Sequence, residues 1–175
     1  MSTFLTSLHV HLPVIHAWSE KQETVMLATG TPLNESQLAD ALRARVAFPE
    51  KIRVIHVETL PQPDSEDLMF IARQIGLFSS RSVGLSLGYG IAVQHDFCAD
   101  RLTLVHEYVH VGQHERKGGL LPYLTDYLRE CIDPGFPFGA LEQEAILVSR
   151  EICKTGEHGG REKNRLPEGI SSLPV

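Results

Sequence analysis

The sequence has few cysteines, no long apolar run and no concentration of positive charge. Its 175 residues hold three cysteines, none of them in a CxxC pair, which argues against a cysteine-built zinc site. No apolar stretch approaches the roughly 18 residues that a membrane span needs, so we expect no insertion into a membrane. The formal net charge is −6 and no run of Lys or Arg occurs, so we expect no nucleic-acid partner.

The cysteines and the first residues also bear on the cellular compartment. Cys98, Cys131 and Cys153 are odd in number and far apart in the chain. The first residues carry no early Lys or Arg, and His9 and His11 interrupt their apolar residues, which is not typical of a secretory signal. We therefore expect reduced thiols and a cytoplasmic location.

The rest of the composition is that of an ordinary globular protein, with 42% hydrophobic and 22% charged residues. A chain of this length is long enough for one domain with a sizeable core. From residue 154 onward the sequence is rich in Gly, Pro and charged residues. We therefore expect a single domain over residues 1–153 and a flexible C-terminal tail over residues 154–175.

The most informative stretch is His106-Glu107-Tyr108-Val109-His110. On a helix, two residues four apart lie about 40° apart around the axis and about 6 Å apart along it. His106 and His110 can therefore bind one Zn²⁺ at the roughly 2.0–2.1 Å of a zinc–nitrogen bond. Glu107 would lie beside the metal, outside its ligand set, where a carboxylate can take a proton from zinc-bound water.

The flanking residues favour a helix at this motif. Asp100 is a suitable N-cap, and Lys117-Gly118-Gly119 is typical of a helix end. One side of the predicted helix is apolar and packs on a core: Leu102, Val105, Tyr108, Val109 and Gly112. The other side is polar and lines a cleft: Thr103, His106, Glu107, His110, Gln113 and His114. The alternative is a surface helix whose histidines are only solvated.

Helical and alternating patterns occur along the same chain, which predicts an α+β fold. Residues 4–16 alternate weakly, and Pro13 limits any strand there. Residues 19–33 have the character of a connection. The predicted strands are 52–57 and a hairpin or glycine-kinked strand over 83–93. Besides the helix at the motif, the predicted helices are 34 or 36 to about 48, 65–77, 121–131 and 139–153, with a loop over 132–137.

A catalytic zinc usually has three protein ligands, so a third is needed. His114 lies eight residues from His106, about 12 Å along the helix axis, which is too far to share one ion. Glu142 and Glu144 on the later helix are better candidates. They are about 200° apart on that helix, so only one can face the metal, and periodicity does not choose between them. The alternative is that both are ordinary surface carboxylates.

Three segments together resemble a group of small bacterial zincin-like metallopeptidases: GLSLGYGIAV, HEYVHVGQ and GALEQEA. The likeness covers roughly residues 83–146. The group shares an HExxH helix followed by Gln and a downstream Glu-x-x-Ala, which falls on Glu142 and Ala145. The resemblance implies Glu142 as the third ligand in a gluzincin-like site. It also implies a minimal zincin-like domain, in which a small sheet packs on the active-site helix and further helices follow.

The chain departs from many gluzincins at Ile146, where an Asp often supports a zinc-binding His from behind. The partner of the zinc histidines is therefore not identified from the sequence. The residue that would stabilise the oxyanion is also left open among Tyr89, Tyr123, Tyr127 and His114.

These features predict a zinc-dependent metallopeptidase with one Zn²⁺ per chain. Glu107 would act as general base on a peptide or protein substrate. In zincin-like folds a strand before the active helix pairs with extended substrate, and residues 83–93 occupy that place. The alternative function is a zinc-stabilised binding or regulatory protein that keeps the HExxH site without turnover.

Overall fold

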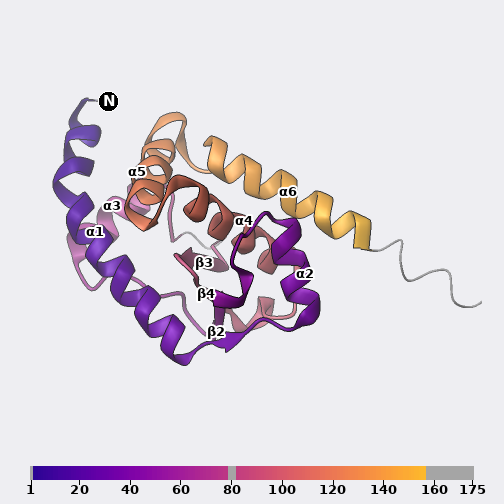
Figure 1. The fold of residues 1–175 in the computed structure, drawn as a ribbon. Coiled ribbons are helices and arrows are strands. Elements are labelled where there is room, and N and C mark those ends of the chain that lie inside the picture. The colour runs from indigo at the N-terminus through magenta and orange to yellow at the C-terminus, as the bar shows by residue number, and fades with distance from the viewer. Residues whose placement is uncertain (1, 79–81, 157–175) are drawn as a thin grey trace, which may run out of the picture.

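The computed structural model describes residues 2–78 and 82–156. Within them the chain forms six α-helices and a four-stranded mixed sheet, which confirms the predicted α+β class (Figure 1). Over these same residues, no helix combines the length and the apolar character required to cross a membrane.

The sheet has the strand order β1-β2-β4-β3. Strand β2 (Arg53–Val57) pairs in parallel with β4 (Gly90–Gln94), and β4 forms an antiparallel hairpin with β3 (Gly84–Leu87). The two-residue strand β1 (Thr31–Pro32) borders β2 on the far side. The strand prediction at 52–57 and the hairpin at 83–93 are therefore confirmed, and β3 is an edge strand.

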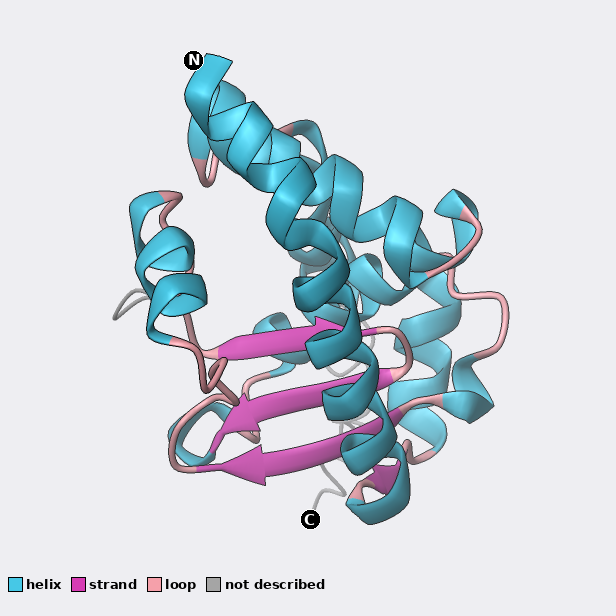
Figure 2. Ribbon diagram, turned by 90° about the vertical axis from the view of Figure 1, so that its left-hand side faces the viewer, coloured by secondary structure: helices cyan, strands magenta, loops and turns pink. Residues whose placement is uncertain are grey.

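Helices cover both faces of the sheet (Figure 2). Helix α1 (Ser2–Thr29) crosses one face, where it contributes Met26 to a core with Leu87 and Ala92. Helix α4 (Arg101–Lys117) covers the other face, where Val105 and Val109 pack with Ile91. Because neighbouring residues of a strand point to opposite faces, Ile91 and Ala92 enter two different cores.

The prediction for the first 30 residues is wrong. Residues expected to form a weak strand and then a connection form the single helix α1, with Pro13 inside it. The positions that join the hydrophobic clusters, Leu12, Ile15, Trp18 and Met26, are spaced at helical intervals. Interspersed histidines and Pro13 obscured this helical period in the sequence. The helix still forms, because a proline removes only one helical hydrogen bond and the other residues of this 28-residue helix tolerate that loss.

The next two helices begin where expected but end early. Helix α2 (Glu35–Arg43) has Asn34 as its N-cap, with a reciprocal pair of hydrogen bonds to Gln37, and stops before Arg45, whose φ is 66°. The prediction extended it to residue 48. Helix α3 (Glu66–Gln74) is capped by Ser65.

The helices of the second half match their predictions closely. Asp100 caps α4 by accepting a hydrogen bond from the Thr103 amide at 3.0 Å, and Gly118 ends it in the left-handed conformation at φ 85°. Helix α5 spans Leu120–Glu130. Most of the predicted loop falls in the segment Cys131–Gly135, where the backbone kinks at Asp133, whose φ of −147° and ψ of 111° are not helical.

Helix α6 spans Ala140–Gly156, so residues 154–156, expected in a flexible tail, belong to a helix. The rest of that predicted tail, 157–175, lies outside the described residues.

Candidate metal centre

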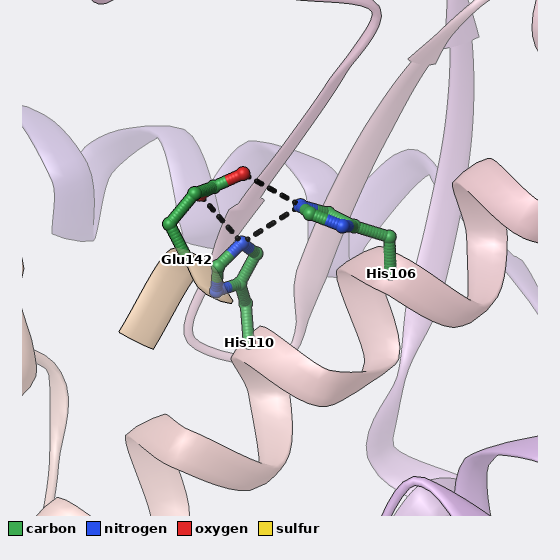
Figure 3. A group of neighbouring side chains, drawn as sticks. All are labelled: His106, His110 and Glu142. Carbon is green, nitrogen blue, oxygen red and sulfur yellow. Dashed lines mark hydrogen bonds and ion pairs between the residues drawn. The ribbon is translucent and has the colours of Figure 1, made fainter. Parts of the chain in front are cut away.

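The two motif histidines lie one turn apart on α4 and point the same way (Figure 3). Their Nε2 atoms are 3.1 Å apart, and the rings meet edge to face with centroids 4.8 Å apart. His110 is buried and His106 is half-buried. The capped ends and the buried back of α4 hold this pair in place, as the spacing predicts.

Glu142 enters from α6 and completes a triangle with the two imidazoles (Figure 3). Its Oε1 lies 3.3 Å from His106 Nε2, and its Oε2 lies 3.4 Å from His110 Nε2. Helix α6 runs antiparallel to α4, because Arg101 at the start of α4 bonds to Cys153 near the end of α6. The structure thus brings together the three predicted ligands from two separate helices.

The triangle has the size and the chemistry of a zinc site. A tetrahedral ion with bonds of about 2.0–2.2 Å separates its ligand atoms by about 3.3–3.6 Å. The two imidazole nitrogens are 3.1 Å apart, and each lies 3.3–3.4 Å from a different oxygen of Glu142. With one oxygen counted for the carboxylate, the three ligand atoms lie within 4.8 Å of one another. Two imidazole nitrogens and one carboxylate oxygen also form a donor set that suits Zn²⁺ and leaves a fourth position for water. In the part of the chain that is described, no other group of three such side chains converges in this way.

The charge states of the group follow from its burial. Burial alone would raise the pKa of Glu142, but hydrogen bonds from His106 and His110 outweigh it and hold that pKa well below the usual range. Burial opposes protonation of His110, yet the hydrogen bond to Glu142 and the nearby carboxylate of Glu107 raise its pKa overall. An ionised carboxylate thus faces the two rings, and a cation there would replace a proton.

Gln113 supplies the support behind His110 that the sequence left unidentified. Its Oε1 lies 2.8 Å from His110 Nδ1, and its Nε2 donates to the Leu141 carbonyl at 2.8 Å and to Glu144 Oε2 at 2.9 Å. Because both donor positions face acceptors, the oxygen must face the ring, and His110 keeps its proton on Nδ1. With the Nδ1 proton held by Gln113, a cation that replaces the Nε2 proton would meet the Nε2 lone pair. The i,i+3 spacing of His110 and Gln113 was the available signal.

Glu144, the other carboxylate left open by periodicity, has a different place. Its side chain pairs with Arg116 Nη2 at 2.8 Å and receives the bond from Gln113. It does not join the triangle formed by His106, His110 and Glu142. The geometry separates the two carboxylates as the resemblance implied.

Glu107 is buried beside the two histidines, with 6% of its surface exposed. Burial raises its pKa, while the two imidazoles and a hydrogen bond with Ser86 moderate the rise. A Cβ on Gly84 would lie 2.4 Å from Glu107 Oε1, so a glycine at this position of β3 makes room for the carboxylate. The edge strand therefore touches the predicted general base directly.

The four residues considered for the oxyanion divide into two pairs. The Tyr127 hydroxyl donates to Glu142 Oε2 at 3.0 Å, and Tyr123 lines the cavity at the site. Tyr89 instead donates to Glu115 at 2.9 Å and meets the His114 ring edge to face. Neither Tyr89 nor His114 lines the cavity, so the structure does not bring these two to the site.

A cavity of about 360 Å³ adjoins the triangle and includes His106, Glu107 and His110 in its wall. Leu102, predicted on the core side of α4, is 40% exposed and also lines the cavity. Gln113 was expected on the cleft side but is buried under α6. The polar face of α4 is thus narrower than predicted, because the start of α6 covers Gln113.

Compared with protein-family models, with curated proteins and with solved structures, the chain finds no match. The resemblance to zincin-like metallopeptidases therefore stays a prediction, which the fold and the site neither establish nor contradict.

Proposed function

We propose that the protein is a zinc-dependent metallopeptidase, with His106, His110 and Glu142 as the protein ligands of one Zn²⁺. The observation that supports this most is that two imidazole nitrogens from α4 and the Glu142 carboxylate from α6 converge to within 4.8 Å of one another, which is a donor set that suits zinc. The carboxylate of Glu107 lies beside them, as the hydrolysis of an amide by activated water requires.

When bound, zinc would lower the pKa of a coordinated water to about 7 and polarise a carbonyl. The chain's own groups then move the proton. Glu107 accepts a proton from the water and returns it to the leaving amine. The Tyr127 hydroxyl donates a hydrogen bond to Glu142 and so helps to hold it in place. Burial, and to a smaller extent the charge of Glu142, raise the pKa of Tyr127, so its hydroxyl keeps the proton that it donates.

The edge strand β3 is suited to hold an extended peptide. It pairs on one side with β4 alone, and Gly84, Leu85 and Ser86 line the cavity beside Glu107. A peptide added along this edge would place a backbone carbonyl next to the site through main-chain hydrogen bonds. The three cysteines are unpaired in the structure, in keeping with our proposal of a reducing, cytoplasmic compartment.

Replacing Glu107 by Gln tests the proposal. We expect the variant to keep about one zinc per chain by elemental analysis and to lose about 10²–10⁴-fold in peptide hydrolysis, since only the general base is removed. The matched control is Glu151→Gln, an exposed carboxylate on α6 that should change neither quantity.

Two outcomes would contradict the proposal in different ways. Zinc well below one per chain in protein purified without a His tag would remove the metal. One zinc per chain with no hydrolysis of any peptide in a mixed library by the unaltered protein would favour the non-catalytic, zinc-stabilised alternative.

A further inference from the structure

The cavity beside the metal centre has a polar part and an apolar part. The polar part consists of the ligand triangle, Glu107 and a few hydroxyl groups. The remaining wall comes mainly from β3, from loops and from three helices that carry none of the proposed zinc ligands, α1, α3 and α5. The main apolar contributors are Ile15 and Trp18 from α1, Leu68, Ile71 and Ala72 from α3, and Leu128 from α5.

The described residues of the wall offer no partner for a charged group beyond the centre itself. Among the described lining residues there is no Lys or Arg, and the only carboxylates are Glu107 and Glu142. A substrate carboxylate would be buried here without a cation, and burying an unpaired charge is strongly unfavourable. An uncharged substrate group therefore suits the described residues of the apolar part better than a charged one.

The cavity is also large enough for a bulky group. Its volume of about 360 Å³ lies within the 300–1,000 Å³ of typical ligand sites. Trp18 meets the Phe78 ring edge to face at 6.5 Å, which joins α1 to the chain that follows α3. Ala72 on α3 is 92% buried yet has only a methyl side chain, so it leaves space that a larger residue would fill.

We infer that this cavity receives a bulky, uncharged apolar side chain of the peptide substrate, next to the bond that is cut. The inference rests on the proposed peptidase function, because it places the scissile carbonyl at the metal. It adds the substrate class: an internal, apolar segment of a peptide, with aromatic or long aliphatic side chains preferred over charged ones.

Binding of small hydroxamates to the zinc-loaded protein tests the inference without any turnover. The series is acetohydroxamate, 3-phenylpropanohydroxamate and the hydroxamate of succinic acid, which carries a carboxylate. We expect calorimetry to give the phenyl compound at least about tenfold tighter binding than acetohydroxamate, since several buried carbons contribute. We expect no gain for the carboxylate compound.

Trp18 provides a second readout, because it is the only tryptophan of the chain and lines the cavity. Its fluorescence should change with the phenyl compound and not with acetohydroxamate. Ala72→Phe should abolish the preference for the phenyl group, and the milder Ala72→Leu should reduce it, both with zinc content unchanged. Phe70→Ala is the matched control on α3, since Phe70 is 64% exposed and does not line the cavity.

Equal affinity for all three compounds, tightest binding of the carboxylate compound, or no binding to protein that holds zinc would each overturn the inference. Failure of the proposed function gives a different pattern. In that case the phenyl preference and the Trp18 change are present while no peptide is cleaved, and the cavity then binds an apolar ligand that is not hydrolysed.

Discussion

The metal centre and the apolar wall of the cavity face the same space but are built in opposite ways. At the centre, α4 and α6 hold polar groups in a connected set of hydrogen bonds, from Glu144 through Gln113 to His110. In the apolar wall, α1 and α3 contribute mainly apolar side chains, whose contribution is to exclude water. The metal centre depends on the positions of individual atoms. The apolar wall depends on the volume of the cavity and on the apolar area around it.

This difference predicts different tolerance to change. A hydrogen-bonded group that loses one partner leaves another buried and unsatisfied, which is costly. An apolar side chain that borders a cavity is not packed on every side. Its truncation therefore removes fewer contacts than truncation of a fully packed side chain. Substitutions at the centre should therefore affect zinc binding strongly, and substitutions in the apolar wall should not affect it.

Glu142→Ala should have the largest effect. It removes a ligand from a buried triangle, so we expect zinc affinity to fall more than about 100-fold, beyond the 10–100-fold typical for a supporting residue. Glu144→Ala is the matched variant on the same helix and should cost at most about tenfold, because Gln113 still donates to the Leu141 carbonyl. Competition with a chelating dye measures both. A larger loss for Glu144→Ala would reverse the ligand assignment.

Gln113→Ala should come next. It leaves His110 Nδ1 without its acceptor at 2.8 Å, so the ring loses its fixed tautomer and orientation. We expect zinc affinity to fall about 10–100-fold. Gln143→Ala is the control, since the Gln143 side chain donates to the Pro137 carbonyl of the loop before α6 and not to His110. If both variants bind zinc like the unaltered protein, Gln113 does not position His110.

The same contrast explains what the sequence could predict. The centre was predicted in its main parts because His106, Glu107 and His110 follow one helical period, and the caps at Asp100 and Gly118 mark the ends of that helix. The role of Gln113 was not predicted, because its orientation depends on a hydrogen bond to the Leu141 carbonyl on α6, 28 residues later in the chain. The spacing of residues within one helix can be read from the sequence, whereas the partner of a side chain on another helix depends on how the helices pack.

The apolar wall was not predicted. Its α1 part lies in a segment expected to be a strand and a connection, because Pro13 and neighbouring histidines obscured a helical period. A helix was predicted over 65–77, which contains Leu68 and Ile71, but periodicity does not distinguish a face that fills a core from one that borders a cavity. That distinction depends on what the rest of the chain leaves empty.

The smallest effect should come from Leu68→Ala, in a comparison with Leu104→Ala. Both leucines are 6% exposed, but Leu104 belongs to the packed cluster around α4, while Leu68 borders the cavity. Truncation of Leu104 leaves a new hole and should lower the free energy of unfolding by about 2–5 kcal/mol. Truncation of Leu68 only enlarges an existing cavity, so the loss should be near the transfer term alone, about 1–2 kcal/mol.

Urea unfolding of the two variants measures this difference, with zinc content as the second readout, which Leu68→Ala should leave unchanged. Equal losses of stability would mean that α3 packs as tightly as α4 and that the cavity wall is part of the core. A smaller loss at Leu68 would mean that the side chains of the wall contribute little to stability. Their size and shape can then suit the substrate without unfolding the protein.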